Sequence, residues 1–347
     1  MSDGRGYLRI ATEEAYAPKE VLDAYGRVLD EGTGDLGFAS LWDYYLRNPT
    51  DQPRMLRERI QDLGDLRLGD MDALGIDHQV LSVTAGIDTL DVSLGRDLAQ
   101  LTNERIAEAS RTHPARFSGL AAVALQDIDF SVAELRRAVT ELGLKGLMIN
   151  SHVKGEYLDQ PKFEPIFAAA EELGVPIYLH PNTPSDQFIR PLLDGGLEGA
   201  IHGFAVETGT HLLRLIVGGL FDRYPRLKFV VGHLGEALPF TLFRIDHFHG
   251  VQQRSGRYPN RPQLELKPSE YFRRNIWLTT SGMAWEPAIM FTASTLGADR
   301  VLYAMDYPFQ FARDEVAVHD ELPISADDRR RLFQSNALEV FQLELPV

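Results

Sequence analysis

The alternation of apolar runs with amphipathic helical segments constrains the fold of this chain more than any other feature. Several runs, such as "KFVVG" and "PIYLH", are almost continuously apolar, as is typical of parallel strands covered on both faces. The candidate strands are 7–12, 79–84, 116–124, 146–150, 176–180, 227–233, 276–281 and 300–306. Eight strands with intervening helices predict a (β/α)8 TIM barrel, an α/β fold, in a single domain spanning residues 1–347.

A doubly wound open sheet is the alternative fold for this pattern. It is disfavoured because no Gly-rich phosphate loop follows the first candidate strand. Three long stretches lack a strand pattern, namely residues 13–78, 181–226 and 234–275. We interpret them as expanded loops and extra helices, which in a barrel would build a lid over the catalytic C-terminal face.

Composition narrows the functional classes. The chain carries 50 acidic and 35 basic side chains, a formal charge of −15, which argues against a nucleic-acid or anionic-membrane partner. It has no cysteine, so a metal would have to be held by His, Asp and Glu. No apolar run reaches the length of a membrane span, and no apolar leader opens the chain, so we expect a cytoplasmic protein.

Ionisable residues recur at the carboxyl ends of the candidate strands, on the face where barrel enzymes place their chemistry. They are Glu13, Glu14, His152, His180, His233, Glu236 and Asp306. Singly, each has a structural explanation, such as a helix cap or a hydrogen-bonded histidine. Together they predict a catalytic metal site, because His with two carboxylates binds Zn²⁺, Mn²⁺ or Mg²⁺ and leaves positions open for substrate.

The adjacent carboxylates Glu13 and Glu14 cannot both face the mouth of the barrel. Successive side chains of an extended backbone point to opposite sides, so only one of them can face inward. We expect Glu13 to be the ligand and Glu14 to bond the backbone or support the site from the outer side.

Four motifs resemble the amidohydrolase superfamily, specifically its branch of non-oxidative aromatic decarboxylases: "EEAY", "YLHP", "GHLGEALP" and "YAMDYP". The resemblance runs nearly end to end and includes "INSHVKGEYLD" and "TTSGMAWEPAI". It implies that Glu13, His180 and Asp306 bind metal and that His233 and Glu236 form a catalytic pair.

One departure from the superfamily pattern bears on the metal count. Ala15 stands where the usual His-x-His motif has its second histidine, and no lysine ends the fourth strand to bridge two metals. This favours a single metal. The resemblance implies Mn²⁺, with Zn²⁺ or Mg²⁺ as alternatives.

The reaction implied is metal-dependent, non-oxidative decarboxylation of an ortho-hydroxyaryl carboxylate in the catabolism of lignin-derived aromatics. The substrate would be 5-carboxyvanillate-like or a dihydroxybenzoate, and the products a phenol and CO₂. Asp306 would protonate the ring carbon, and His233, supported by Glu236, would relay the phenolic proton. A metal-dependent lactonase or amidase of the same superfamily is the alternative function, and a barrel without turnover is a third hypothesis.

The resemblance also implies which loops contact the substrate. Arg244 matches an anion contact, Tyr45 a lid aromatic, and Phe204 a ring-packing residue. Gln52 and Phe309 stand where enzymes acting on 5-carboxyvanillate carry Arg and Tyr, which leaves the exact substrate open. The relatives implied by these motifs assemble as homodimers or homotetramers, and we expect the same here.

Overall fold

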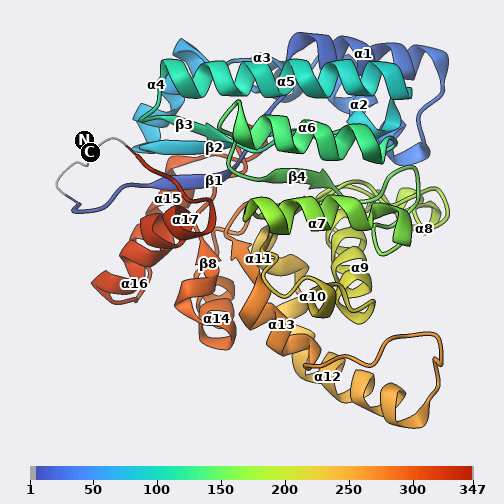
Figure 1. Cartoon of the computed structure of the whole chain (residues 1–347). Coiled ribbons are helices and arrows are strands. Elements are labelled where there is room, and N and C mark those ends of the chain that lie inside the picture. Colours follow the sequence, from blue (N-terminus) through green and yellow to red (C-terminus); the bar gives the residue numbers. More distant parts are fainter. Residues whose placement is uncertain (1–4, 346–347) are drawn as a thin grey trace.

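A computed structural model describes residues 5–345 and contains eight parallel strands (Figure 1). They are β1 (Ile10–Tyr16), β2 (His78–Val83), β3 (Phe117–Gly119), β4 (Leu147–Asn150), β5 (Ile177–His180), β6 (Phe229–Val231), β7 (Ile276–Thr279) and β8 (Val301–Leu302). Every predicted strand overlaps an observed one. The third to eighth strands are all shorter than predicted, most clearly the third, sixth and eighth, and the first extends to Tyr16.

The strands close into a barrel. Parallel pairing joins β1 to β3 through β2, and joins β4 to β8 in chain order. Parallel bridges between Ala121 and Leu147 and between Glu14 and Tyr307 connect the two groups of strands. At the second junction, the Ala15 amide donates a hydrogen bond to the Tyr307 carbonyl at 2.7 Å. This closed arrangement confirms the predicted (β/α)8 fold and replaces the open-sheet alternative.

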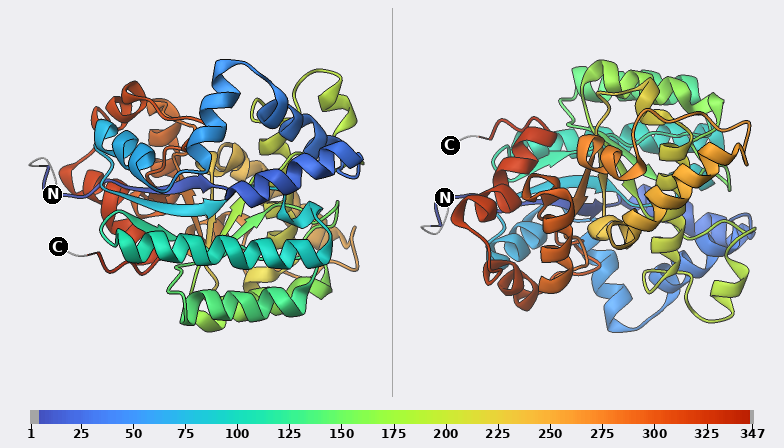
Figure 2. Two further views of the ribbon diagram at one scale, coloured as in Figure 1. Left: turned by 90° about the horizontal axis from the view of Figure 1, so that it is seen from above. Right: turned by 90° about the horizontal axis from the view of Figure 1, so that it is seen from below.

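Helices surround the strands on all sides (Figures 1 and 2). They are α1 (Lys19–Glu31), α2 (Leu36–Arg47), α3 (Asp51–Ile60), α4 (Asp65–Leu74), α5 (Val92–Thr112), α6 (Ile128–Thr140), α7 (Glu164–Leu173), α8 (Arg190–Leu193), α9 (Gly203–Val217), α10 (Leu220–Arg223), α11 (His233–Glu236), α12 (Leu238–Ser255), α13 (Pro268–Asn275), α14 (Glu286–Leu296), α15 (Arg313–Asp320), α16 (Ala326–Arg330) and α17 (Asn336–Val340). The three stretches without a strand pattern hold α1–α4, α8–α10 and α11–α13, and α12 projects from the barrel (Figure 1). Across residues 5–345, no helix combines the length and apolarity needed to cross a membrane.

Alternate strand residues fill the interior of the barrel. Met148 on β4 and Tyr178 on β5 belong to the same buried cluster as Val230 on β6. Because side chains alternate along a strand, the residues two positions later, Asn150 and His180, also face the interior, at its mouth.

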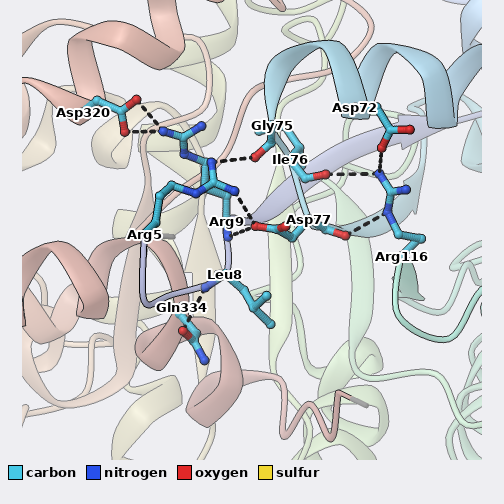
Figure 3. A network of polar contacts seen from close by, with 10 residues as sticks. All are labelled: Arg5, Leu8, Arg9, Asp72, Gly75, Ile76, Asp77, Arg116, Asp320 and Gln334. Atoms are coloured by element: carbon cyan, nitrogen blue, oxygen red, sulfur yellow. Dashed lines mark hydrogen bonds and ion pairs between the residues drawn. The ribbon is translucent and has the colours of Figure 1, made fainter. Parts of the chain in front are cut away.

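Ion pairs link the segments at the amino ends of the strands, the end of the barrel opposite Asn150 and His180 (Figure 3). Asp77, just before β2, accepts hydrogen bonds from the Arg9 amide at 2.8 Å and from Arg5 Nη2 at 3.0 Å. The Arg9 guanidinium also pairs with Asp320 of α15. These contacts lie at the amino ends of the strands, where barrel residues serve stability, so the chemistry belongs at the other end.

Candidate active site

Glu13 lies within β1, because this strand continues past its predicted end at Thr12. The pairing of β1 with β2 shifts register between Ala11 and Glu14, next to Glu13. The side chain is only 2% exposed. Its Oε2 atom accepts hydrogen bonds from the Tyr178 hydroxyl and from Thr279 Oγ1, the latter at 2.8 Å. A Cβ atom at Gly232 would lie 2.8 Å from Oε2, so this carboxylate requires glycine beside it.

Among residues 5–345, no hydrogen-bond donor reaches the other carboxylate oxygen of Glu13. Glu13 Oε1 is buried and unpartnered, and His180 Nε2 lies 3.4 Å from it. His180 Nδ1 lies 2.8 Å from the Pro181 carbonyl, which assigns the proton to Nδ1 and leaves a lone pair on Nε2. Burial lowers the pKa of His180, which keeps the ring neutral. Two lone-pair donors therefore face each other, and a metal cation between them would satisfy both.

His233 and Asp306 complete the cluster. Ligand atoms of Glu13, His233 and Asp306 all lie within 4.8 Å of one another. His233 Nδ1 is 2.8 Å from Glu236 Oε1, and its Nε2 is 3.8 Å from Glu13 Oε1. His233 and Asp306 have φ angles of 51° and 75°. Such left-handed backbone in non-glycine residues stores strain and is concentrated at functional sites.

The electrostatics assign different protonation states to these groups. Burial and the neighbouring Glu13 raise the pKa of Asp306 well above its ordinary value. Burial acts to raise the pKa of Glu13 too, but His233 and His180 outweigh it and the pKa is lowered. Burial acts to lower the pKa of His233, whereas Glu236 and Glu13 raise it to about 10. Asp306 and His233 are therefore the proton-carrying groups of the cluster.

The cluster contains the five residues predicted to bind metal or to act in catalysis: Glu13, His180, Asp306, His233 and Glu236. Their roles stay predictions, and the short distances also make His233 a candidate ligand. His152 does not join the cluster: its Nε2 lies 3.0 Å from the Thr183 carbonyl, a hydrogen-bond distance.

Glu14 has the backbone-bonding role expected of it. Its Oε1 accepts a hydrogen bond from the Met305 amide at 3.0 Å. The side chain points away from the barrel interior but is completely buried. Burial raises the pKa of Glu14 to about 8.

Two of the predicted substrate contacts line the approach to this cluster. Tyr45 of α2 and Phe309 pack edge to face, with ring centroids 5.4 Å apart. Burial and the neighbouring Asp306 raise the pKa of Tyr45 to about 12, so the Tyr45 hydroxyl is electrostatically coupled to Asp306. Phe204 is half-buried in the first turn of α9.

The structure does not bring Gln52 or Arg244 into this cluster. Gln52 is exposed on α3, where its Oε1 accepts a 3.5 Å hydrogen bond from the Tyr44 hydroxyl. Arg244 is exposed on the projecting helix α12, with its guanidinium 4.8 Å from the Phe248 ring centroid. Their substrate roles stay predictions.

Sequence reasoning missed three residues around the cluster. Tyr178 and Thr279 hold the Glu13 carboxylate, and Asn150 pairs in register with His180. Asn150 Oδ1 is buried without a hydrogen-bond partner among the described residues. The alternation of strand side chains was the available signal, because Tyr178 precedes His180 by two positions on one strand.

Residues 39–343 match the family described as Amidohydrolase, and the chain belongs to that family. This confirms the resemblance drawn from the motifs. The barrel is closed, and the cluster that could bind a metal lies at the carboxyl ends of its strands. TIM-barrel enzymes carry their active sites at this end.

Individual relatives extend over nearly the whole chain. The gamma-resorcylate decarboxylase of Rhodococcus jostii is 36% identical over 350 residues, covering 97% of this chain and 99% of the relative. A solved 5-carboxyvanillate decarboxylase from Novosphingobium aromaticivorans, complexed with manganese and 4-hydroxy-3-methoxy-5-nitrobenzoic acid, superposes with a TM-score of 0.96 at 47% identity, covering 98% of this chain and 97% of that one. The 2,6-dihydroxybenzoate decarboxylase from Rhizobium gives a TM-score of 0.84 at 32% identity, covering 97% and 99%.

Proposed function

We propose that this protein is a metal-dependent decarboxylase that converts an ortho-hydroxyaryl carboxylate into the phenol and CO₂ without an oxidant. The observation that carries the proposal is that Glu13 Oε1 lies 3.4 Å from His180 Nε2 without a hydrogen bond among the described residues, with Asp306 close to Glu13. The activities named for the relatives support the reaction type. Manganese in the solved 5-carboxyvanillate decarboxylase supports Mn²⁺ as the metal.

In this proposal Glu13, His180 and Asp306 hold one divalent metal. The donor set fits such an ion, because it contains the neutral imidazole of His180 and the carboxylates of Glu13 and Asp306. Of these, Glu13 Oε1 is buried and has no hydrogen-bond partner among the described residues. When bound, the metal supplies Lewis-acid stabilisation of the substrate oxygens and orients the ring. Tyr178 and Thr279 keep Glu13 Oε1 turned toward it.

Asp306 delivers a proton to the ring carbon that bears the carboxylate. Burial and Glu13 favour the protonated form of Asp306, and the positive charge of a bound metal would offset part of that effect. Once the new C–H bond forms, the C–C bond to the carboxylate breaks, CO₂ leaves, and its bonding electrons restore the aromatic ring. A positioned general acid contributes about 10²- to 10⁴-fold to such a step.

His233 orients the phenolic oxygen, because its protonated Nε2 can donate a hydrogen bond to that oxygen. The Glu236 carboxylate, 2.8 Å from Nδ1, fixes the ring so that Nε2 points at the cluster. Tyr45, Phe309 and Phe204 would form apolar walls for the aromatic ring. Arg244 and Gln52 remain the proposed polar determinants of substrate choice.

The test is a substrate panel. Mn²⁺-loaded protein is incubated with 5-carboxyvanillate, 2,3- and 2,6-dihydroxybenzoate, salicylate and orsellinate, while ring absorbance and headspace CO₂ are followed. At least one acid should lose CO₂, and chelation should stop the reaction. Hydrolysis of lactones or amides with no change in any of the five acids would instead identify the hydrolase alternative.

We also propose that the chain forms a homodimer or homotetramer through α12. Helix α12 projects from the barrel (Figure 1). Its side chains Phe240 and Phe243 are 79% and 86% exposed. Apolar side chains so exposed on one helix are typical of an association surface. Analytical ultracentrifugation should give an oligomer that Phe243→Asp shifts toward monomer, and a monomeric wild-type protein would contradict the proposal.

A further inference from the structure

The backbone that carries Asp306 is not part of the strand ladder. β8 ends at Leu302, four residues before Asp306. The following segment is attached to β1 instead, since the Thr12 amide donates to the Tyr303 carbonyl at 3.1 Å and the Ala15 amide to the Tyr307 carbonyl at 2.7 Å. The position of Asp306 relative to Glu13 therefore depends on contacts that β1 provides.

The Glu14 side chain holds this segment at the residue before Asp306. Glu14 Oε1 accepts a hydrogen bond from the Met305 amide at 3.0 Å. On the other side of Asp306, the Tyr307 carbonyl accepts a hydrogen bond from the Ala15 amide, so both neighbours of Asp306 are bound to residues of β1. Because Asp306 has a φ of 75°, its conformation is strained and persists only where its surroundings hold it.

Glu14 is itself held firmly. Its Oε2 accepts a hydrogen bond from Gln79 Nε2 at 3.2 Å, and Gln79 Oε1 accepts one from Arg67 Nη1 at 3.3 Å. Arg67 Nη2 donates to the Ala15 carbonyl at 2.6 Å, and its guanidinium lies 4.4 Å from the Tyr307 ring centroid. All of these groups are buried, so the Glu14 carboxylate cannot swing away from the Met305 amide without losing partners.

We propose that Glu14 is a positioning residue for Asp306, acting through the reach of its side-chain oxygen to the backbone amide of Met305. Adjacent residues of β1 then divide the work: Glu13 holds the metal and Glu14 holds the proton donor at the right place beside it. The inference rests on the proposed decarboxylation. It is distinct from a charge effect of Glu14 on Asp306, which would depend on the carboxylate's charge and not on its reach.

Two conservative variants separate reach from charge. Glu14→Asp keeps the carboxyl group but withdraws it by about 1.5 Å, one carbon–carbon bond. Glu14→Gln keeps an acceptor oxygen at full reach and cannot ionise. We expect Glu14→Asp to lower kcat about 10²-fold with little change in KM, because misplacing a reacting group by about 1 Å costs that much. Glu14→Gln should rescue kcat to within about tenfold of wild type, since it perturbs only the bond to Gln79.

Hydrogen exchange gives a readout that does not depend on turnover. Amide exchange of a peptide covering residues 301–309 should accelerate in Glu14→Asp and stay near wild type in Glu14→Gln. In Glu14→Gln, binding of Mn²⁺ and of 4-hydroxy-3-methoxy-5-nitrobenzoic acid should change less than about threefold, because Glu13 keeps its own partners and Asp306 keeps its place. In Glu14→Asp, Mn²⁺ affinity should fall together with kcat, because the displaced Asp306 is also a proposed metal ligand. If the wild type itself releases no CO₂ from any acid, the proposed function fails, while the exchange data still decide the Glu14 contact.

The inference is overturned if the two variants rank the other way in kcat and amide protection. If Glu14→Gln loses kcat and amide protection while Glu14→Asp keeps both, the charge of Glu14 is what matters. Wild-type kcat in Glu14→Asp also overturns it. So does a loss of kcat in both variants accompanied by an equal loss of Mn²⁺ affinity, because that pattern marks a general structural role.

Discussion

Replacing Tyr178 with Phe tests whether the hydroxyl network around Glu13 prepares it to bind metal. Tyr178 and Thr279 are the two hydroxyl donors to Glu13 Oε2, and they leave Oε1 free to face His180. Burial and Glu13 raise the pKa of Tyr178 well above its ordinary value, so its hydroxyl keeps the proton it donates. Tyr178→Phe removes this donor and the 3.1 Å hydrogen bond between the Tyr178 hydroxyl and Thr279 Oγ1.

The magnitude follows from the nature of the bond. A hydrogen bond to a charged group contributes about 1.5–3 kcal/mol, and 1.4 kcal/mol is a factor of ten, so the affinity for Mn²⁺ should fall about 10- to 100-fold. Loss of outer partners of metal ligands costs affinity over the same range. The loss should be larger at acidic pH, because the Tyr178 hydrogen bond lowers the pKa of Glu13 and its removal lets protons compete better with the metal.

Calorimetric titration of metal-free protein with Mn²⁺ measures this effect. Tyr271→Phe is the matched control, because the Tyr271 hydroxyl also donates to a carboxylate, the partly buried Asp222, but outside the active-site cluster. The control should bind Mn²⁺ like wild type. Affinity of Tyr178→Phe within twofold of wild type, or an equal loss in the control, would refute the reasoning.

Three further outcomes are expected. His180→Ala should abolish Mn²⁺ binding in the same titration, whereas His233→Asn should retain binding within about tenfold and lose turnover; the reverse pattern would make His233 the ligand. Asp306→Asn should release no CO₂ while remaining folded, and wild-type release would remove Asp306 from the acid role. Burial lowers the pKa of His78 from 6.5 to about 4, so the unfolded chain binds more protons between these values. The free energy of unfolding in urea should therefore fall as pH drops through that window, and less so in His78→Gln; equal slopes for the two proteins would contradict this.

Much of the fold could be predicted because it depends on local patterns. Apolar runs and helical periodicity located all eight strands, and the carboxyl-end rule then gathered Glu13, His180, His233 and Asp306 before any coordinates. The end of β1 could not be predicted. Two adjacent glutamates interrupt the apolar pattern, yet both are buried, because Tyr178, Thr279 and the Met305 amide supply partners from the other side of the barrel.

The substrate contacts show the other limit. Tyr45 and Phe309 pack against each other, whereas Arg244 stands on a projecting helix in contact with Phe248. Motif matching places a residue along the chain and does not say what its helix packs against.

The sequence alone determined the barrel, the face that carries the chemistry, and a metal site without thiolates, because periodicity and residue type are local properties. Strand alternation predicted separate roles for the two glutamates, but only the tertiary structure decided which donors each of them meets. Glu13 presents an oxygen without a donor to the lone pair of His180, while Glu14 accepts the Met305 amide. The physical reason is that a buried carboxylate takes its role from the donors around it, and folding brings those donors from strands far apart in the chain.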